Sequence, residues 1–391
     1  MRKSSLTLSA LFSIGALLLS GCSRAEPQPS QSQTAQASGG STLTIWVDAE
    51  LSDTAKTLAE QYAQDTGGTL NIVEKDFYQI EAELASGAPD LFIGSNEWTD
   101  RLAAAGVIAP ASEQEPAGFE TRVLQGASYQ GVLYGIPYAI ESLALVCNGD
   151  ELKQQPSSLT ELTDAGYNVI VTPGGDPYTL FPIQSSFDLY PLVLDENGDW
   201  QEQSGLGSAR FKEFATWLGE NQSLFTQLDY SAGIAAFVDG QETCLLTGPW
   251  AISEILNRAK FTVSVYDFPS VGGSQPLSFA TARAVFVSAT SANQNQAKRV
   301  ANYFANSATQ LLIYKQTGRI PAKAEVISEI QDPIIKGFAK AAAWSVVLPN
   351  SKLMQNTWAP WSKTLNTIIT TDEDPQITWD LMVQDLAKAA G

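Results

Sequence analysis

One carboxylate, Glu141, stands inside an otherwise apolar stretch, Tyr134–Asn148, where it could take part in binding chemistry. A short turn, Gly135–Pro137, leads into this stretch, and the apolar run Ser142–Val146 follows the acid. Such a run, bounded by turn residues, is typical of a strand buried on both faces. An acid beside it is costly unless a partner pairs with it, so Glu141 either reaches solvent at the strand end or binds something.

Polar and aromatic residues also follow two predicted strands. The segments Thr42–Asp48 and Pro89–Gly94 have strand patterns, and each precedes a helical pattern. Strands that alternate with helices predict a parallel sheet covered on both sides, with ligands at the carboxyl ends of its strands. Four residues just past these ends are therefore candidate ligand contacts: Glu50, Asn96, Glu97 and Trp98.

The strand–helix pattern starts again after Asn148, with different segment lengths, and the chain from Gln294 onward is mostly helical in pattern. One compact lobe would not need a second start of the sheet. The segment from residue 42 to 391 is also long enough for two domains. We therefore expect an α/β protein of two lobes, with the chain crossing between them more than once.

Composition excludes several classes of function. The net charge of −19 argues against nucleic acid or an anionic membrane surface as a partner. The chain contains no histidine, which excludes histidine triads, Cys–His dyads and histidine metal sites. We expect no metal and no cofactor.

The N-terminus has the pattern of an export signal. A basic start, Met1–Lys3, precedes a short apolar region, and Leu19–Cys22 resembles the lipobox of bacterial lipoproteins. We expect a lipoprotein signal peptide over 1–21, lipid on Cys22, and a disordered tether over 22–41, where large apolar residues are scarce. The alternative is an ordinary signal peptide with a chance cysteine.

Two cysteines remain in the mature chain, Cys147 and Cys244, and both lie in apolar runs with strand patterns. In an exported protein an even pair suggests one disulfide. The alternative is two buried free thiols that act as small apolar side chains.

Several motifs, in the same order over nearly the whole mature chain, resemble the maltose- and maltodextrin-binding branch of the extracellular solute-binding proteins that serve ABC sugar importers. The most specific are Pro137–Glu141 and the Glu242–Thr243 pair followed by Gly248–Trp250. The others are Leu43–Trp46, Asp65–Gly67, Ala85–Phe92, Asp176–Tyr178, Phe181–Pro182, Ala232–Phe237, Leu348–Asn350 and Trp358.

This resemblance implies a two-lobed periplasmic-binding-protein fold of type II, with sugar held between the lobes. It places the N-terminal lobe at 42–139 and 284–325 and the C-terminal lobe at 140–283 and 326–391. The chain would cross near Ala139–Ile140, near Phe279–Arg283 and after Ile320–Pro321.

The resemblance also implies that Glu141 accepts hydrogen bonds from sugar hydroxyls, which a buried carboxylate does well. Aromatic rings would pack on the apolar faces of the sugar, although core packing is the commoner fate of tryptophan. The remaining implied ligand contacts are Glu50, Asp176, Tyr178, Trp250, Trp358 and Trp361.

Departures from the family pattern leave the identity of the sugar undetermined. Gly94 stands where the family has a tryptophan, Trp98 where it has an arginine, and Leu51 where it has a lysine. The segment Trp358–Trp361 replaces a tryptophan–tyrosine pair and an arginine. A neutral glucoside still fits, but maltose, trehalose and longer maltodextrins are not distinguished.

The resemblance implies a monomeric, lipid-anchored receptor on the outer face of the membrane that delivers its sugar to ABC permease subunits, and not an enzyme. Two alternatives come from other classes. A glycoside hydrolase would use two of the acids, one of them with a raised pKa. A receptor for a non-sugar solute would share the fold but not the ligand.

Overall fold

The computed structural model describes residues 40–111, 116–167, 169–171, 175–195, 200–208, 210–224, 228–349 and 351–390. The predicted signal peptide, the lipid site at Cys22 and nearly all of the predicted tether lie outside these ranges. Within them, no helix combines the length and the apolar character that crossing a membrane would require.

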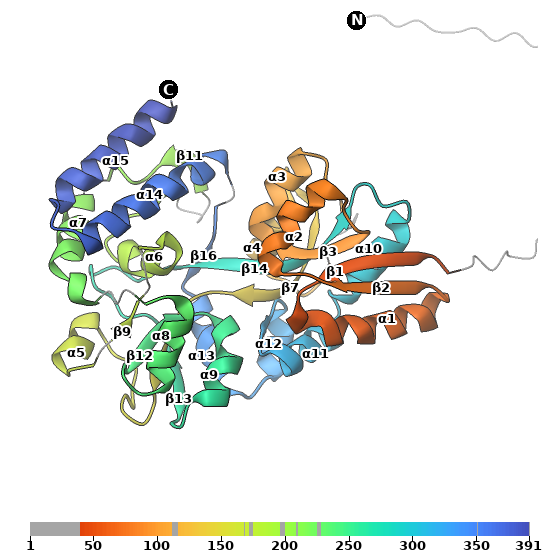
Figure 1. Cartoon of the computed structure of the whole chain (residues 1–391), viewed down its shortest axis with the longest axis horizontal. Helices are drawn as coiled ribbons and strands as arrows, with labels where there is room; N and C mark the ends of the chain where they lie inside the picture. The colour runs from red at the N-terminus through yellow and green to blue at the C-terminus, as the bar shows by residue number, and fades with distance from the viewer. Residues whose placement is uncertain are drawn as a thin grey trace, which may run out of the picture. The chain divides into compact units, whose positions relative to one another are not determined.

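The larger sheet has eight strands in the order β15-β7-β14-β3-β1-β2, with β4 and β16 paired to β14 off this path (Figure 1). Strands β1, β2 and β3 run parallel, as their alternation with helices predicts, while β14 is antiparallel to both β3 and β7. The strand bounds are β1 (Thr42–Val47), β2 (Thr69–Glu74), β3 (Leu91–Ser95), β4 (Ile108–Ala109), β7 (Gly135–Glu141), β14 (Ser278–Ser288), β15 (Ile320–Pro321) and β16 (Ser345–Val347).

The helices that pack around the larger sheet, which together with it form the first half of the fold, begin and end at the residues that local chemistry favours. Helix α1 ends at Gly67, whose φ of 69° is left-handed and therefore suits glycine. Asp76 caps α2 by accepting the backbone N–H of Tyr78. The elements are α1 (Ser52–Thr66), α2 (Phe77–Glu83), α3 (Thr99–Ala104), α4 (Thr121–Gly126), α10 (Gln294–Tyr303), α11 (Ser307–Thr317), η1 (Ala49–Leu51), η2 (Leu84–Ser86), η3 (Asn96–Trp98), and the pair β5 (Ser128–Tyr129) and β6 (Val132–Leu133).

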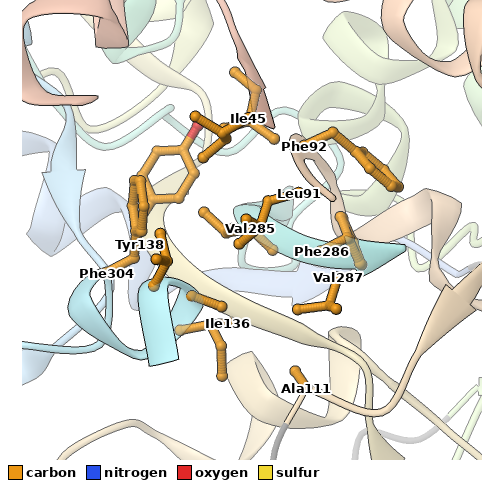
Figure 2. Close-up of a cluster of buried hydrophobic side chains, with 14 of the residues drawn as sticks. Ile45, Leu91, Phe92, Ala111, Ile136, Tyr138, Val285, Phe286, Val287 and Phe304 are labelled. Carbon is orange, nitrogen blue, oxygen red and sulfur yellow. The ribbon is translucent and has the colours of Figure 1, made fainter. Parts of the chain in front are cut away.

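One hydrophobic core belongs to this half and draws only on residues between 43 and 139 and between 284 and 313. Figure 2 shows part of it, where β1, β3, β7 and β14 contribute neighbouring side chains. The rings of Tyr138 and Phe304 pack 5.8 Å apart, and those of Phe92 and Phe286 pack 5.5 Å apart. These buried contacts hold the strand ends that carry Glu50 and Glu141 in fixed positions.

The smaller sheet has four strands in the order β13-β8-β12-β9. Cys147 of β8 lies directly opposite Cys244 of antiparallel β12, and a disulfide joins the two. The strands are β8 (Ala144–Asn148), β9 (Val169–Ile170), β12 (Cys244–Thr247) and β13 (Val263–Tyr266), with a separate hairpin of β10 (Leu192–Leu194) and β11 (Trp200–Ser204).

Helices pack around this second sheet, and their cores include residues from the last third of the chain. Two clusters draw on residues 143–279, 320–341 and 348–382. The helices are α5 (Leu159–Asp164), α6 (Pro177–Ser185), α7 (Phe211–Glu220), α8 (Tyr230–Val238), α9 (Ile252–Arg258), α12 (Ala324–Glu329), α13 (Pro333–Ala342), α14 (Lys352–Thr370), α15 (Pro375–Ala390), η4 (Gln222–Leu224) and η5 (Pro249–Ala251).

Two strands differ from the sequence expectation, and both matter for the site. Gly135–Pro137 is not a turn but the start of β7, and the pairing of β7 with β14 is irregular between Arg283 and Ala284. Strand β14 begins at Ser278, six residues before the apolar run Ala284–Ser288 that predicted it. In Figure 1 both strands run between the helices and strands around the larger sheet, on the right, and those around the smaller sheet, on the left.

Candidate functional site

Three partly exposed aromatic side chains form a connected group with the buried ring of Phe279. Tyr178 lies 6.1 Å from Phe279 and 6.3 Å from Trp250, and Trp358 lies 6.5 Å from Phe279, between ring centroids. We call Tyr178, Trp250, Trp358 and Phe279 the aromatic group. They come from α6, η5, α14 and β14, so the fold brings together rings that are distant in sequence.

Local structure fixes two of these rings. Asp176 caps α6 by accepting hydrogen bonds from the backbone N–H of Tyr178 (3.2 Å) and from the hydroxyl of Thr179 (2.9 Å). At Gly248 an added Cβ would lie 2.0 Å from the ring of Trp250, so only glycine leaves room for this ring position. The Asp176–Tyr178 and Gly248–Trp250 motifs therefore place the aromatic group through backbone geometry.

Burial raises the pKa of Asp176, although the hydrogen bonds from Thr179 and from the backbone N–H of Tyr178 act in the opposite direction. The carboxylate already accepts two hydrogen bonds within its own helix turn. Its first role is thus to position Tyr178, and its free lone pairs remain available to a ligand.

Glu141 sits in a buried ionic network instead of reaching solvent, so the solvent-exposed alternative is wrong. Its side chain is 4% exposed, and its two oxygens accept hydrogen bonds from different arginines: Nε of Arg283 at 2.9 Å and Nη1 of Arg319. Arg319 also donates from Nε and Nη2 to Glu50 at 3.0 and 2.7 Å. We call Glu50, Glu141, Arg283 and Arg319 the ionic network.

The network keeps its charges because each buried ion has a partner. Burial alone would raise the pKa of Glu141, but the charges and hydrogen bonds of Arg283 and Arg319 outweigh it and leave that pKa below its ordinary value. Burial would likewise lower the pKa of Arg319, but Glu141 and Glu50 raise it overall. Removing one partner would leave an uncompensated buried charge.

Neither arginine was found among the sequence candidates, although one physical argument pointed to them. A carboxylate in an apolar run needs a cation, and Arg283 lies inside the apolar stretch Phe279–Ser288. The guanidinium of Arg283 also stacks over the ring of Phe77, with Cζ 3.5 Å from the ring centroid. Phe77 was not a candidate either.

Two of the residues predicted after β3 face inward. Trp98 is 5% exposed and stacks on Phe77 at 5.2 Å, and its ring fills the space next to Gly94. Asn96 is 1% exposed, and its Oδ1 accepts the backbone N–H of Ala282 at 2.7 Å. Both side chains therefore support strands in this structure, and their role as ligand contacts stays a prediction.

Asn96 lines a cavity of about 120 Å³ beside Ile140, Ala282 and Ile320, and no member of the aromatic group borders that cavity. Glu97 is half-buried, and burial raises its pKa against the opposing charges of Arg101 and Arg283. The charge of Arg283 thus acts on Glu97, while Asn96 contacts the backbone of Ala282, the residue before Arg283.

Trp361 packs in the second core. It is 0% exposed, and its indole N–H donates to Oε1 of Gln184 at 2.9 Å, so its role as a ligand contact stays a prediction. Trp358, three residues earlier, is partly exposed, as a stacking platform for a sugar would have to be. Within the described residues, no three Cys, Asp or Glu side chains are grouped so that they could hold a metal ion.

A family model described as bacterial extracellular solute-binding protein matches residues 57–340, well over half of the sequence. The chain belongs to this family. The family assignment covers both halves of the fold and both the aromatic group and the ionic network, apart from Glu50 and Trp358, which lie outside the matched range.

Several curated relatives are similar over much of the sequence. A maltotriose-binding protein of Pyrococcus abyssi is 25% identical over 296 residues, which cover 70% of this chain and 64% of that protein. A galactooligosaccharide-binding protein of Bacillus subtilis is 23% identical over 389 residues, 90% of each chain. A maltooligosaccharide ABC transporter solute-binding lipoprotein of Streptococcus pneumoniae is 23% identical over 380 residues, 89% of this chain and 88% of its own.

The fold matches solved members with two lobes. The maltotriose-binding protein of Thermus thermophilus, solved with maltotriose, superposes with a TM-score of 0.78 at 23% identity, over 89% of this chain and 100% of that chain. The predicted fold class, an α/β protein of two lobes, each with a sheet flanked by helices, is confirmed. The structural comparison establishes the fold but does not identify the ligand of this chain.

Proposed function

We propose that this family member binds a maltooligosaccharide between its two lobes and delivers it to the permease of an ABC importer. The observation that carries the proposal is the aromatic group, in which partly exposed rings of Tyr178 and Trp358 lie beside Phe279 and that of Trp250 lies beside Tyr178. Such rings fit the apolar faces of pyranose sugars. The maltotriose- and maltooligosaccharide-binding relatives support the choice of an α-glucoside.

The lobes of this proposal are 42–139 with 284–325 and 140–283 with 326–391. The division of the hydrophobic cores supports these bounds in outline, because one cluster stops at Ala139 and resumes at Ala284. Ile320 packs with the second half, so the last crossing lies close to that residue.

A calorimetric panel tests the ligand. We expect maltotriose to bind, maltose and trehalose to bind more weakly or not at all, and amino acids to give no heat. A galactooligosaccharide belongs in the panel because one relative binds that class. If galactooligosaccharides or amino acids bind tightly and maltotriose does not bind, the proposed ligand is wrong and the solute that binds takes its place.

A glycoside hydrolase is the alternative from another class. A retaining or inverting hydrolase needs an acid with a raised pKa opposite a second carboxylate. Glu141 does not suit the acid's role, because Arg283 and Arg319 keep its pKa low. Asp176 has a raised pKa, but both of its oxygens accept hydrogen bonds in the first turn of α6, where it acts as the helix cap. Incubation of the purified protein with maltotriose should therefore release no glucose, and steady release would overturn the receptor proposal.

The Leu19–Cys22 motif supports export and attachment through lipid on Cys22, and a relative named as a lipoprotein supports the same arrangement. The partners of the proposal are the oligosaccharide, the permease subunits and the membrane that the lipid enters, with the protein acting as a monomer on the outer face. Replacement of Cys22 with alanine should move the protein from the membrane fraction to the soluble fraction.

A further inference from the structure

The guanidinium of Arg283, a member of the ionic network, also contacts an aromatic ring. Its Nε donates to Oε2 of Glu141 at 2.9 Å, and its Cζ lies 3.5 Å from the centroid of Phe77. The side chain is 13% exposed. A hydrogen bond at its edge and a ring over one face therefore hold the guanidinium in one orientation, so little conformational entropy remains to be lost when it binds a ligand.

One nitrogen of this guanidinium has an unused donor. Nη1 of Arg283 is buried and has no hydrogen-bond partner among the described residues. Arg319 is different, because its Nε, Nη1 and Nη2 all donate to Glu50 or Glu141. An unsatisfied buried donor on a charged group is costly, and native structures rarely leave one without a partner, ordered water or ligand.

The surroundings of Arg283 point to the binding site. Arg283 and Phe279 are four residues apart in β14, and alternate side chains of a strand share a face, so Arg283 lies on the same face of β14 as Phe279 of the aromatic group. Its charge also opposes the rise that burial causes in the pKa of the Tyr178 phenol and of the Glu97 carboxyl. Tyr178 belongs to the aromatic group, 6.3 Å from Trp250. A sugar packed on these rings would therefore lie within reach of Arg283.

Glu141 has a different relation to such a ligand. Each of its oxygens already accepts a hydrogen bond from an arginine. Its main effect is to orient Arg283 and Arg319, so the ionic network presents a donor to the ligand where the sequence alone predicted an acceptor.

We propose that Arg283 is a specificity-determining residue whose Nη1 donates a hydrogen bond to one hydroxyl oxygen of the saccharide, with Glu141 as its positioning residue. This inference rests on the proposed function. It selects a ligand that presents a hydroxyl oxygen as an acceptor beside the ring of Tyr178.

Calorimetry with maltotriose and a set of analogues, each lacking one hydroxyl, tests this contact. For the wild-type protein one analogue should bind roughly 10- to 100-fold more weakly, the worth of a hydrogen bond from a charged donor. Arg283→Met should weaken binding of maltotriose by a similar factor, and the critical analogue should then bind no more weakly than maltotriose. Arg258→Met is the matched control, since Arg258 pairs with Glu254 on the surface of α9, and it should leave every affinity unchanged.

Two further variants separate binding from folding. Arg283→Lys keeps the positive charge but loses the guanidinium fork, so it should fold and still lose the discrimination against the critical analogue. Glu141→Gln should weaken binding yet retain that discrimination. If the discrimination disappears in Glu141→Gln and persists in the Arg283 variants, Glu141 contacts the sugar and the inference is wrong.

The outcomes for the two proposals differ. If both Arg283 variants bind maltotriose as tightly as the wild-type protein does, the proposed role of Arg283 is wrong and the proposed function stays intact. The same conclusion follows if every analogue binds more weakly than maltotriose by the same factor in the wild-type and the variant proteins. Absence of any saccharide binding by the wild-type protein would overturn the proposed function and, with it, this inference.

Discussion

Trp358 and Trp361 lie one helical turn apart in α14, with ring centroids 5.8 Å apart and ring planes at 78°, yet only Trp361 is completely buried. Residues three apart share a helix face, and Trp361, one turn further along α14, packs against Gln184 and the second core. Trp358 keeps a partly exposed ring near Phe279. One helix therefore supplies a core residue and a candidate ligand platform from neighbouring positions.

Replacing Trp361 with alanine should reduce stability. Loss of a completely buried tryptophan leaves a cavity and an unpaired amide oxygen on Gln184, so we expect a loss of about 3–5 kcal/mol in the free energy of unfolding. Urea denaturation monitored by circular dichroism measures it. Trp361→Phe, which keeps much of the volume, should lose less, and equal stability of wild type and Trp361→Ala would contradict the core assignment.

Replacing Trp250 with alanine should instead reduce affinity. Its ring is partly exposed and stacks beside Tyr178, so we expect maltotriose binding to weaken by about 1–3 kcal/mol with little change in melting temperature. Trp344→Ala is the control, because that tryptophan is 46% exposed and belongs to no part of the aromatic group. Normal affinity together with a melting temperature several degrees lower would make Trp250 a core residue.

The sequence predicted the two-lobed α/β fold and several ligand candidates, because strand–helix alternation and motif order depend on local patterns. It missed the roles of Arg283 and Arg319, since ion pairs that join residues more than a hundred positions apart leave no local periodicity. The start of β14 was missed for a related reason, because Ser278–Arg283 mixes Phe279 and two alanines with polar residues and carries no continuous apolar run. The complete burial of Trp361 was not foreseen, because motif similarity does not say how deeply a helical residue packs.

The ionic network should give the protein an acid-sensitive stability that Glu141→Gln removes. The folded-state pKa of Glu141 lies below its ordinary value of 4.5, so its ionised form stabilises the fold above that pH. As the pH falls below 4.5 toward the folded-state pKa, this contribution should disappear. The difference in unfolding free energy between wild type and Glu141→Gln, about 3–5 kcal/mol near neutral pH, should therefore shrink in acid.

Urea titrations at several pH values measure that difference. The raised pKa values of Glu97 and Asp176 act in the opposite sense, but they are present in both proteins, so they largely cancel in the difference. Glu325→Gln is a suitable control. Hydrogen bonds from Ser307 and Lys323 lower the pKa of Glu325, but its carboxylate is exposed, so we expect this substitution to change the unfolding free energy little at any pH. A difference that stays constant from neutral to acid pH would contradict the ionised state of Glu141.

The disulfide between Cys147 and Cys244 should matter for stability and not for binding. The two cysteines are 97 residues apart and completely buried, so the bond closes a long loop in the unfolded chain. Reduction during unfolding should remove about 2–5 kcal/mol of stability. Urea curves with and without dithiothreitol test this, and the double variant Cys147→Ala/Cys244→Ala should show no response to the reductant.

The three predicted crossings between the lobes lie side by side in the larger sheet. Ala139 and Ile140 of β7 pair with Ala282 and Arg283 of β14 on one side and with β15 on the other. The ionic network joins the same segments, because Glu141 ends β7, Arg283 lies in β14 and Arg319 directly precedes β15. A few residues in adjacent strands can therefore absorb a rotation of one lobe against the other.

We expect saccharide binding to shift the protein toward a closed arrangement, because a ligand that contacts both lobes binds the closed form more tightly than the open form. Arg283 would contact the sugar from the crossing strands while Tyr178, Trp250 and Trp358 contact it from the second half. X-ray scattering should then show a smaller radius of gyration with saturating maltotriose. A sugar that gives no heat in the calorimetric panel serves as the control and should leave the curve unchanged. If maltotriose binds tightly and the scattering curve does not change, the site is a static one, and the importer must recognise the loaded protein by some feature other than its closure.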